Sequence, residues 1–402
     1  MSAYVQLRIA VFHAAFLGGG AERVAIGMVR TLLPFSTVTL YTFTDVDWRK
    51  LEYYYGLDPL SEGDLSRLRI KRVPGAWLGR SDSAICHRMY SIRQYLLSMI
   101  ARQVCAHYDI CISSFNELDM GTIGLQYVHA PMFASKSVPA REKLGIPARG
   151  LRGAVRRLVR VATGWRDERA LSNVTLTNSQ WTAKLLEETW DVRARVVYPP
   201  VSLNRFSEAS QASWGSRRDD VICISRLVPE KRIERAIEIV AGLRQKGFSV
   251  HLHLIAGGAA DAAYARRIEN LVRQSSGWIH LYRNVTAEEL RRLAGSCRVG
   301  LHVREGEQFG LAVAELVGAG CVVFVPRVGG QAEIVGHLDD VVFSDAAEAV
   351  EKISRILENH QLALHLQGSC QRKLELFSQA RFERSIRQIV FELVEHKGRI
   401  DA

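Results

Sequence analysis

The sequence predicts an α/β protein made of two doubly wound, Rossmann-like domains that face a cleft. Three observations support this fold class. Apolar, strand-like runs alternate with helical runs through the first half of the 402 residues, a polar segment at residues 207–220 interrupts them, and the alternation restarts at Val221. Strands that alternate with helices form parallel sheets with crossover helices. Ligands of such sheets bind beyond the carboxyl ends of the strands, which we expect to face the cleft.

The first predicted domain spans residues 1–205, and apolar periodicity sets the bounds of its elements. The predicted strands are residues 8–12, 37–42, 110–112, 124–128 and 195–201, and the predicted helices are residues 21–33 and 91–106. Pro199 and Pro200 close this half. The polar residues 207–220, rich in Ser, Gly and Arg, indicate a linker.

The second predicted domain spans residues 206–380 and repeats the alternation. Its predicted strands are residues 221–224, 251–256 and 299–303, and its predicted helices are residues 232–245, 262–275, 287–294 and 311–318. A last helix, at residues 382–395 within the terminal segment 381–402, is expected to pack back onto the first domain.

Composition narrows the class of protein. A hydrophobic fraction of 48% with 24% charged residues is typical of a soluble globular enzyme and excludes a disordered or fibrous chain. The seven cysteines include no C-x-x-C pair, so we expect reduced, buried thiols of a cytoplasmic protein rather than a disulfide framework or a zinc site. No apolar run reaches the roughly 18 to 20 residues that span a bilayer. Residues 7–17 lack a signal cleavage site, which favours a first strand.

The net charge of +11 is concentrated in the first half of the chain. Residues 1–200 carry 26 Lys and Arg against 17 Asp and Glu, so this half holds +9 of the total. Much of the excess lies in residues 141–169, where arginines alternate with apolar residues and Trp165. These arginines include Arg149, Arg152, Arg156, Arg157, Arg160 and Arg166. A basic amphipathic helix of this kind is typical of a surface for anionic lipid headgroups, and a solvated Arg-rich helix is the alternative. Nucleic acid is not expected as a partner, because stacking aromatics are sparse and nucleic-acid-binding motifs are missing.

The most informative segment is residues 304–321, a glycine-containing loop that leads from an apolar run into a helix. The backbone N–H groups near Phe309, Gly310 and Leu311 would point at an anion, assisted by the helix dipole. Glu307 and Glu315 stand eight residues apart, so they can share one face. Two acids beside a phosphate are better placed to bind hydroxyls, which indicates a nucleotide sugar. The alternative is that both are ordinary dipole-matching surface acids.

Two other loops also join a strand to a helix. Residues 225–231 (SRLVPEK) bring Arg226 and Lys231 to the same cleft, where two cations would neutralise a departing diphosphate; solvated charges at a helix start are the alternative. Residues 18–20 are glycines, which allow close approach of a ligand but fit neither a dinucleotide nor a P-loop motif, so a tight turn is equally compatible. Gly257 and His129 also stand at predicted strand ends.

These elements in this order resemble the retaining glycosyltransferases of family 4, which have the GT-B fold. Within the family, the motifs look most like those of the α-mannosyltransferases that extend lipid-linked oligosaccharides. The motifs that carry the resemblance are residues 18–23 (GGGAER), 127–131 (YVHAP), 177–182 (TNSQWT), 197–200 (VYPP) and 225–231 (SRLVPEK). Residues 50–110 and 132–165 depart from the family pattern, and we expect the acceptor site there.

The resemblance implies a role for each candidate residue. Arg226 and Lys231 would bind the donor diphosphate, Glu307 the transferred sugar and Glu315 the ribose, while His129 would lie near the sugar. The catalytic set implied is Glu307, His129, Arg226 and Lys231. The donor-binding set adds Gly18, Gly19, Gly20, Gly257, Val285, Phe309, Gly310, Leu311 and Glu315.

The same resemblance implies a mechanism that needs no cofactor and no metal. In the family's same-face attack the leaving phosphate accepts the acceptor's proton, so no enzymic nucleophile is required. A rival signal is the D-x-D of Asp45 and Asp47, a pattern that holds a donor-bound metal in the other glycosyltransferase fold.

The implied partners are a nucleotide-sugar donor, an acceptor and a membrane. GDP-mannose is the expected donor, with a UDP-sugar as its rival, and a lipid-linked saccharide or glycolipid is the expected acceptor. The protein would be cytoplasmic and peripheral on the inner membrane face. A UDP-sugar-dependent enzyme with a soluble acceptor and a non-catalytic nucleotide- or nucleic-acid-binding protein remain as alternatives.

Overall fold

The computed structural model describes residues 6–16, 19–55, 57–75, 90–131, 151–201, 213–258 and 260–400. The chain divides into two compact units. Unit 1 comprises residues 1–200 and 379–402, and unit 2 comprises residues 201–378. The predicted boundaries, at residues 205 and 380, lie within a few residues of these.

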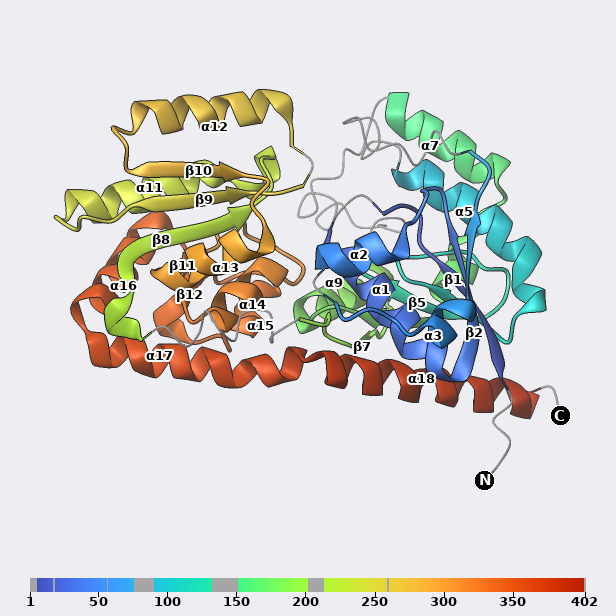
Figure 1. Cartoon of the computed structure of the whole chain (residues 1–402). Coiled ribbons are helices and arrows are strands. Elements are labelled where there is room, and N and C mark those ends of the chain that lie inside the picture. The colour runs from blue at the N-terminus through green and yellow to red at the C-terminus, as the bar shows by residue number, and fades with distance from the viewer. Residues whose placement is uncertain are drawn as a thin grey trace. The chain divides into compact units, whose positions relative to one another are not determined.

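Unit 1 is built on a seven-stranded parallel sheet with the strand order β3-β2-β1-β4-β5-β6-β7 (Figure 1). Its strands are β1 (Leu7–Phe12), β2 (Ser36–Thr42), β3 (Leu68–Arg72), β4 (Ile110–Ser113), β5 (Leu125–Val128), β6 (Val174–Thr177) and β7 (Arg195–Val196). Its helices are α1 (Gly20–Leu32), α2 (Trp48–Tyr55), α3 (Glu62–Ser66), α5 (Tyr90–Val104), α7 (Leu151–Ala162), α8 (Asp167–Leu171), α9 (Gln180–Trp190) and α18 (Gln379–Ile400). The strand order reverses between β1 and β4, which is where a doubly wound sheet binds its ligand.

Unit 2 is built on a six-stranded parallel sheet with the order β10-β9-β8-β11-β12-β13. Its strands are β8 (Arg218–Ser225), β9 (Leu252–Ala256), β10 (Ile279–Arg283), β11 (Cys297–Leu301), β12 (Val322–Pro326) and β13 (Val342–Phe343). Its helices are α11 (Ile233–Gln245), α12 (Ala262–Gln274), α13 (Ala287–Ser296), α14 (Leu311–Gly318), α15 (Gln331–Ile334), α16 (Ala346–Glu358) and α17 (His360–Lys373). Here the order reverses between β8 and β11. The prediction of two doubly wound α/β units is therefore confirmed.

Local sequence signals fix where several helices begin. Ser179 and Asp261 each accept a hydrogen bond from the backbone N–H three residues later, at the starts of α9 and α12. Thr286 and Glu289 form a reciprocal capping box at the start of α13. These side chains satisfy N–H groups that have no partner inside the helix.

The terminal helix α18 belongs to the hydrophobic core of unit 1. It packs on α1, and Phe382, Ile386 and Val390 are fully buried with the apolar side chains of β1 and α1. A Cβ on Gly27 of α1 would lie 3.1 Å from Phe382, so the missing side chain permits this close approach. The helix is thus a structural part of the first unit.

Two predicted boundaries are wrong. Residues 218–220, assigned to the linker, are the start of β8, where the Asp220 carboxylate accepts a hydrogen bond from the His251 N–H and lies 3.1 Å from the His253 ring. The strand predicted at residues 195–201 ends at Val196, shortly before Pro199 and Pro200, which have no N–H to donate to a sheet.

The cysteine prediction is also wrong in one respect. Cys105 and Cys111 form a disulfide, with Cα atoms 6.0 Å apart, whereas the sequence predicted reduced thiols throughout. Cys111 lies in β4 and Cys105 in the short turn Cys105–His107 before it, and both side chains are buried in one apolar cluster. Cys223, Cys297, Cys321 and Cys370 are free and buried, and Cys86 lies outside the described residues.

Candidate functional site

The polar residues of unit 2 gather where its strand order reverses. The segment after β8 carries Arg226 and Lys231, and the segment after β11 carries Arg304 and Glu307. Because β8 and β11 are neighbouring parallel strands, both segments leave the sheet at its carboxyl edge. The crossover helices α11 and α14 then depart on either side of the reversal.

Lys231 and Glu307 form an ion pair at this edge. Lys231 ends the 3-10 turn Pro229–Lys231, and Arg232, with φ of 48°, turns the chain sharply into α11. Only 15% of the Lys231 side chain and 12% of the Glu307 side chain are exposed, so water screens the pair poorly.

Three basic groups surround the Glu307 carboxylate. Besides Lys231, the Arg304 guanidinium lies 3.4 Å from both carboxylate oxygens, and His302 Nε2 lies 3.6 Å from Oε2. Burial alone would raise the pKa of Glu307, but Lys231 and Arg304 outweigh it and hold the pKa well below the ordinary value. Glu307 is therefore an ionised acceptor at neutral pH, suited to receiving hydrogen bonds from hydroxyl groups.

The loop that carries Glu307 is held by its backbone. The Gly330 N–H donates to the Glu307 carbonyl at 2.7 Å, and the Gly306 N–H donates to the Val328 carbonyl at 2.8 Å. Arg235 of α11 pairs with Glu305 at 2.6 Å. The carboxylate is thus positioned before any ligand arrives.

The N-terminus of α14 lies directly after this loop. Gly310 adopts φ of 100°, and among the described residues the N–H groups of Gly310, Leu311 and Ala312 have no hydrogen-bond partner. Phe309 is buried against the Phe377 ring, with centroids 5.4 Å apart, so its ring anchors the turn and leaves only backbone for a ligand. Free N–H groups at a helix N-terminus suit an anion, and the anion site that the sequence analysis placed here stays a prediction.

The other predicted donor residues reach the same edge of the sheet without touching Glu307. Arg226 follows β8, Gly257 follows β9 and Val285 follows β10, while Glu315 lies half-buried on α14. In the described part of the chain, the Arg226 guanidinium makes no hydrogen bond or ion pair. That leaves one cation at this edge available to an anionic ligand.

The reversal point of unit 1 holds neutral polar groups instead. His13 follows β1 and Ser114 follows β4, and His13 Nδ1 lies 3.0 Å from Ser114 Oγ. His129 Nε2 lies 3.1 Å from the Ser114 carbonyl, which can only accept, so His129 donates there and keeps Nδ1 as an acceptor. Asn116 accepts hydrogen bonds from the His129 and Ala130 N–H groups.

Burial keeps both histidines uncharged. It lowers the pKa of His13 to about 3, assisted by His129, and lowers that of His129 to about 4. Sequence reasoning found His129 and missed His13, Ser114, Asn116 and His302. Position was the available signal for two of them, because His13 directly follows the predicted strand 8–12 and Ser114 lies two residues after the predicted strand 110–112. His302 was hidden inside the predicted strand 299–303, which ends at Leu301.

The glycine loop at the start of α1 is tied to α2. Gly19 donates to the Tyr55 hydroxyl at 3.0 Å, and that hydroxyl donates toward the Glu22 carboxylate at 2.9 Å. Gly19 and Gly20 are exposed, and Gly18 lies outside the described residues.

The D-x-D residues have structural partners. Asp45 pairs with Arg72 at 2.8 Å, and Asp47 accepts from the Lys50 N–H at the start of α2. Over the described residues, no cluster of three or more His, Cys, Asp or Glu side chains could hold a metal ion.

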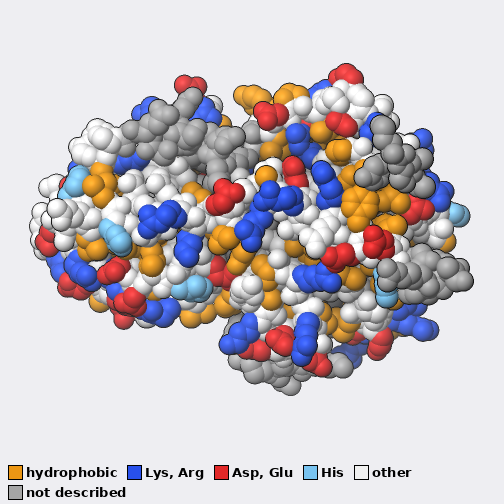
Figure 2. Space-filling view, turned by 90° about the horizontal axis from the view of Figure 1, so that it is seen from below, with side chains coloured by type: hydrophobic (Ala, Val, Ile, Leu, Met, Phe, Trp, Pro, Cys, Tyr) orange, Lys and Arg blue, Asp and Glu red, His pale blue; other side chains and the backbone are white. Residues whose placement is uncertain are grey.

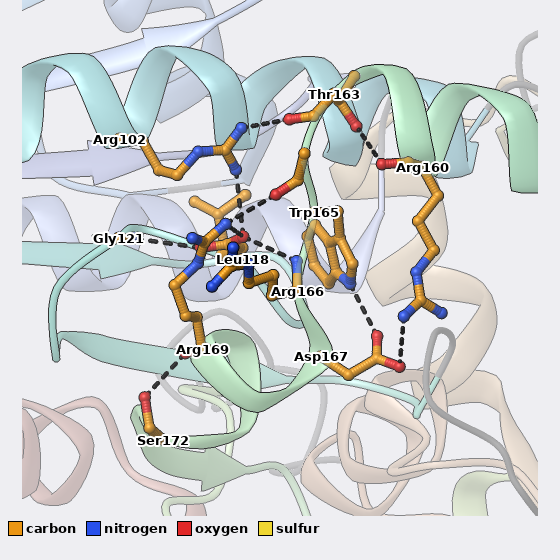
Figure 3. Close-up of polar contacts among 12 residues, drawn as sticks. Arg102, Leu118, Gly121, Arg160, Thr163, Trp165, Arg166, Asp167, Arg169 and Ser172 are labelled. Carbon is orange, nitrogen blue, oxygen red and sulfur yellow. Dashed lines mark hydrogen bonds and ion pairs between the residues drawn. The ribbon is translucent and has the colours of Figure 1, made fainter.

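The basic segment differs from the single amphipathic helix that was predicted. Helix α7 ends at Ala162, Gly164 turns the chain with φ of 64°, and α8 follows (Figure 3). Trp165, expected at a lipid surface, is 5% exposed; it packs edge-on against Tyr95 and donates to Asp167 at 2.8 Å. This part of the prediction is wrong.

Buried Asp119 accounts for the turn. Arg169 donates to its carboxylate at 2.8 Å and 2.6 Å, Arg102 at 3.1 Å and the Arg166 N–H at 3.0 Å. Figure 3 labels these three arginines. Arg160 pairs in turn with Asp167 at 2.9 Å. Several arginine charges that the sequence assigned to a surface thus hold α7 and α8 in place.

Part of α7 remains outward-facing. Leu158 is 69% exposed and Val161 is 74% exposed, one turn apart, with Arg157 also exposed beside them. Residues 141–150 lie outside the described part, as do the side chains of residues 151–156. None of the helices in the described ranges combines the length and apolarity needed to cross a bilayer.

Surface charge elsewhere is mixed. Figure 2 shows Lys and Arg side chains interspersed with Asp and Glu over one face of the molecule. Ion pairs such as Arg327–Asp339 and Lys246–Glu351 are typical of such a surface. This face presents no continuous basic track among its described residues, which disfavours nucleic acid.

A protein-family model matches most of unit 2. The model described as "Glycosyl transferases group 1" matches residues 205–369. Residues 205–369 form a glycosyl transferase group 1 domain. The Lys231–Glu307 pair and the start of α14 both lie within this domain.

Relatives and solved structures agree with this domain. The chain is 24% identical over 250 residues to the GDP-Man:Man(3)GlcNAc(2)-PP-Dol alpha-1,2-mannosyltransferase of Dictyostelium discoideum, covering 57% of this chain and 49% of that protein. The chain thus spans about half the length of the curated relatives it matches.

Two solved structures share the fold across the whole chain. Sucrose-phosphate synthase from Thermosynechococcus elongatus matches with a TM-score of 0.70 at 16% identity, covering 97% of this chain and 100% of that one. Anabaena Alr3699/HepE in complex with UDP and glucose matches with a TM-score of 0.67 at 15% identity, covering 96% and 100%. At these identities the likeness shows the GT-B fold, in which the group 1 domain is one of two Rossmann-like units.

Proposed function

We propose that this chain is a retaining glycosyltransferase that transfers a hexose from a nucleoside diphosphate sugar, with GDP-mannose as donor, to a lipid-linked saccharide. The observation that carries the proposal is the charged cluster of the group 1 domain. Paired cations, an ionised buried carboxylate and a row of unpartnered helix N–H groups converge at one reversal point. The mannosyltransferase relatives favour GDP-mannose and a polyprenyl-diphosphate-linked acceptor.

The proposed chemistry divides these groups between leaving group and sugar. The bond between the sugar's anomeric carbon and the diphosphate breaks, and the electron pair leaves with the diphosphate. Lys231, Arg226 and the N–H groups at the start of α14 neutralise that charge. The acceptor hydroxyl attacks the same face of the sugar and passes its proton to the departing phosphate, while Glu307 binds sugar hydroxyls and Glu315 the ribose. No metal ion or enzymic nucleophile is required.

The acceptor is proposed to be presented by a membrane surface. Leu158 and Val161 are exposed next to Arg157, and more arginines precede them in sequence. Exposed apolar side chains flanked by cations suit an anionic lipid headgroup layer, at roughly 1 kcal/mol per basic residue. The proposed location is peripheral, on the inner face of the cytoplasmic membrane.

Calorimetric titration with GDP and UDP tests the identity of the donor. Mass spectrometry of the products formed on extracted membrane lipids tests the acceptor. Tighter GDP binding and a lipid product one hexose heavier are expected. UDP binding with transfer to a soluble acceptor would establish the alternative enzyme, and binding of neither nucleotide would refute the proposal. Nucleotide binding without turnover would indicate a sensor instead.

Sedimentation with vesicles tests the membrane contact separately. The double variant Leu158→Ser with Val161→Ser should bind anionic vesicles several-fold less than the wild type. Leu364→Ser, at a 43% exposed leucine of unit 2, is the matched control and should bind normally. Equal failure of the wild type on anionic and neutral vesicles would overturn the membrane assignment.

A further inference from the structure

His302 is a buried group at the site with no role in the chemistry given above. It directly follows β11, and its backbone N–H donates to the Phe324 carbonyl of β12 at 2.9 Å, which fixes the residue at the sheet edge. The residue is 7% exposed, and its Nε2 atom is buried without a hydrogen-bond partner among the described residues. A buried, unsatisfied ring nitrogen is costly unless it gains a partner in another state of the protein.

The nearest candidate partner is the oxygen that Lys231 now occupies. His302 Nε2 lies 3.6 Å from Glu307 Oε2, just beyond hydrogen-bond range, and Lys231 Nζ contacts that same Oε2 atom. Under the proposed function, Lys231 is also required by the donor diphosphate. A lysine ammonium that turns to a diphosphate gives up much of its contact with the carboxylate.

We propose that His302 is a positioning residue that replaces Lys231 on Glu307 when the donor binds. The Nε2–H group then donates to Glu307 Oε2, a movement of well under 1 Å from the present separation to ordinary hydrogen-bond length. Arg304 stays against the carboxylate throughout. The exchange keeps Glu307 oriented and satisfied while Lys231 serves the leaving group. This inference rests on the proposed function.

The charge of His302 suits this exchange. Burial, with Lys231 and Arg304, lowers the pKa of His302 to about 4 despite the opposing effect of Glu307. A neutral imidazole donates a hydrogen bond without protonating Glu307 or repelling Lys231. A permanent cation in its place would repel Lys231 and would stay paired with Glu307 whether or not the donor is bound.

The kinetic test compares His302→Gln and His302→Ala with His253→Gln, a matched buried histidine of unit 2 outside the site. Glutamine can supply an N–H near the Nε2 position, whereas alanine cannot. We expect His302→Ala to lower kcat roughly 10- to 100-fold, the range for one hydrogen bond to a charged group, with KM and nucleoside diphosphate affinity changed less than threefold. His302→Gln should recover most of the lost kcat, and His253→Gln should match the wild type. Full kcat in His302→Ala would overturn the proposal.

A ligand-free test separates this inference from the proposed function. In protein labelled with 15N-histidine, the Lys231→Met variant removes the competing ammonium, and the His302 signal is identified by its loss in His302→Gln. We expect the His302 Nε2–H resonance to move downfield and to exchange with water more slowly in Lys231→Met than in the wild type. An unchanged resonance would overturn the exchange even if nucleotides bind, whereas failure of GDP and UDP to bind would refute only the function.

Discussion

The two units share a topology but differ in the chemistry at the point where the strand order reverses. In unit 1 the reversal between β1 and β4 holds His13, Ser114 and His129, linked through neutral hydrogen bonds. In unit 2 the reversal between β8 and β11 holds the Lys231–Glu307 ion pair beside Arg304.

This difference shows how one fold can serve two kinds of ligand group. Charged side chains at a helix N-terminus suit a diphosphate, because the attraction is strong and long-ranged in a poorly hydrated site. Neutral imidazole and amide groups suit hydroxyls, because they donate and accept without binding stray ions. Under the proposed function we assign the diphosphate and the hydroxyls bound by Glu307 to unit 2, and we expect the neutral groups of unit 1 to bind further hydroxyls.

Neutralising Glu307 should have the largest effect on turnover. Glu307→Gln keeps the shape but removes the acceptor charge, so we expect kcat to fall by about 10³-fold while the free nucleoside diphosphate still binds. Steady-state kinetics with parallel calorimetry measure both. Glu351→Gln, at an exposed acid of α16 away from the site, is the control. Near-wild-type transfer by Glu307→Gln would contradict the sugar-binding role.

Removing one cation of unit 2 should lower transfer activity less than Glu307→Gln does. Lys231→Ala and Arg226→Ala should each lower kcat/KM by on the order of 10²-fold, because each neutralises part of the developing diphosphate charge. Lys246→Ala, on the exposed end of the same β8–α11 crossover, should behave as the wild type. If donor kinetics respond to His129→Ala but not to either cation, the assignment of ligands to the two units is reversed.

Acid should weaken the protein through its buried neutral histidines. His13 and His129 have folded-state pKa values of about 3 and 4, below the ordinary 6.5. Their contribution to the free energy of unfolding is complete above pH 6.5. It is lost as the pH falls below 6.5, because the unfolded chain then binds protons that the folded protein does not bind. At pH 5 each histidine should lower the free energy of unfolding by roughly 2 kcal/mol relative to neutral pH.

Urea unfolding at pH 7.0, 6.0 and 5.0 measures this loss. In His13→Asn the acid-dependent part of the loss should shrink by about the share of one histidine. An identical pH dependence in His13→Asn would show that His13 is protonated in the folded state.

A chelator should have the smallest effect. Because cations of the chain itself are proposed to neutralise the diphosphate, millimolar EDTA should leave transfer rates within the error of the assay. Asp45 and Asp47 are engaged with Arg72 and the start of α2. Loss of activity with EDTA that a divalent ion restores would support a metal site at Asp45 and Asp47. The proposal that only unit 2 neutralises the diphosphate would then be wrong.

The sequence was most informative for features that neighbouring residues determine, such as strands and the loops that follow them. Alternating apolar runs located β1, β2, β4 and β5, and the glycine loop located the start of α14, where we propose that N–H groups bind an anion. Lys231 and Glu307 were both predicted as site residues, but their direct contact was not, because 76 residues separate them. Only the adjacency of β8 and β11 brings them together.

Predictions failed where tertiary contacts override local pattern. The arginines of residues 157–169 form an amphipathic pattern, yet Arg169 donates a hydrogen bond to Asp119, 50 residues away. This contact helps to end the helix near Gly164. His13 and His302 carry no motif, and their significance comes from burial beside groups distant in sequence. Polar Arg218, Asp219 and Asp220 resembled a linker because their partners in β9 and β11 lie far along the chain.

The place of α18 has a consequence for biosynthesis. Unit 1 is discontinuous, and Phe382, Ile386 and Val390 complete the core around α1 only after all of unit 2 has left the ribosome. Until then the apolar side chains of α1 that pack against α18 in the finished fold lack that cover. A chain stalled before residue 379 should therefore recruit chaperones through α1, whereas unit 2 can close its own sheet and fold first.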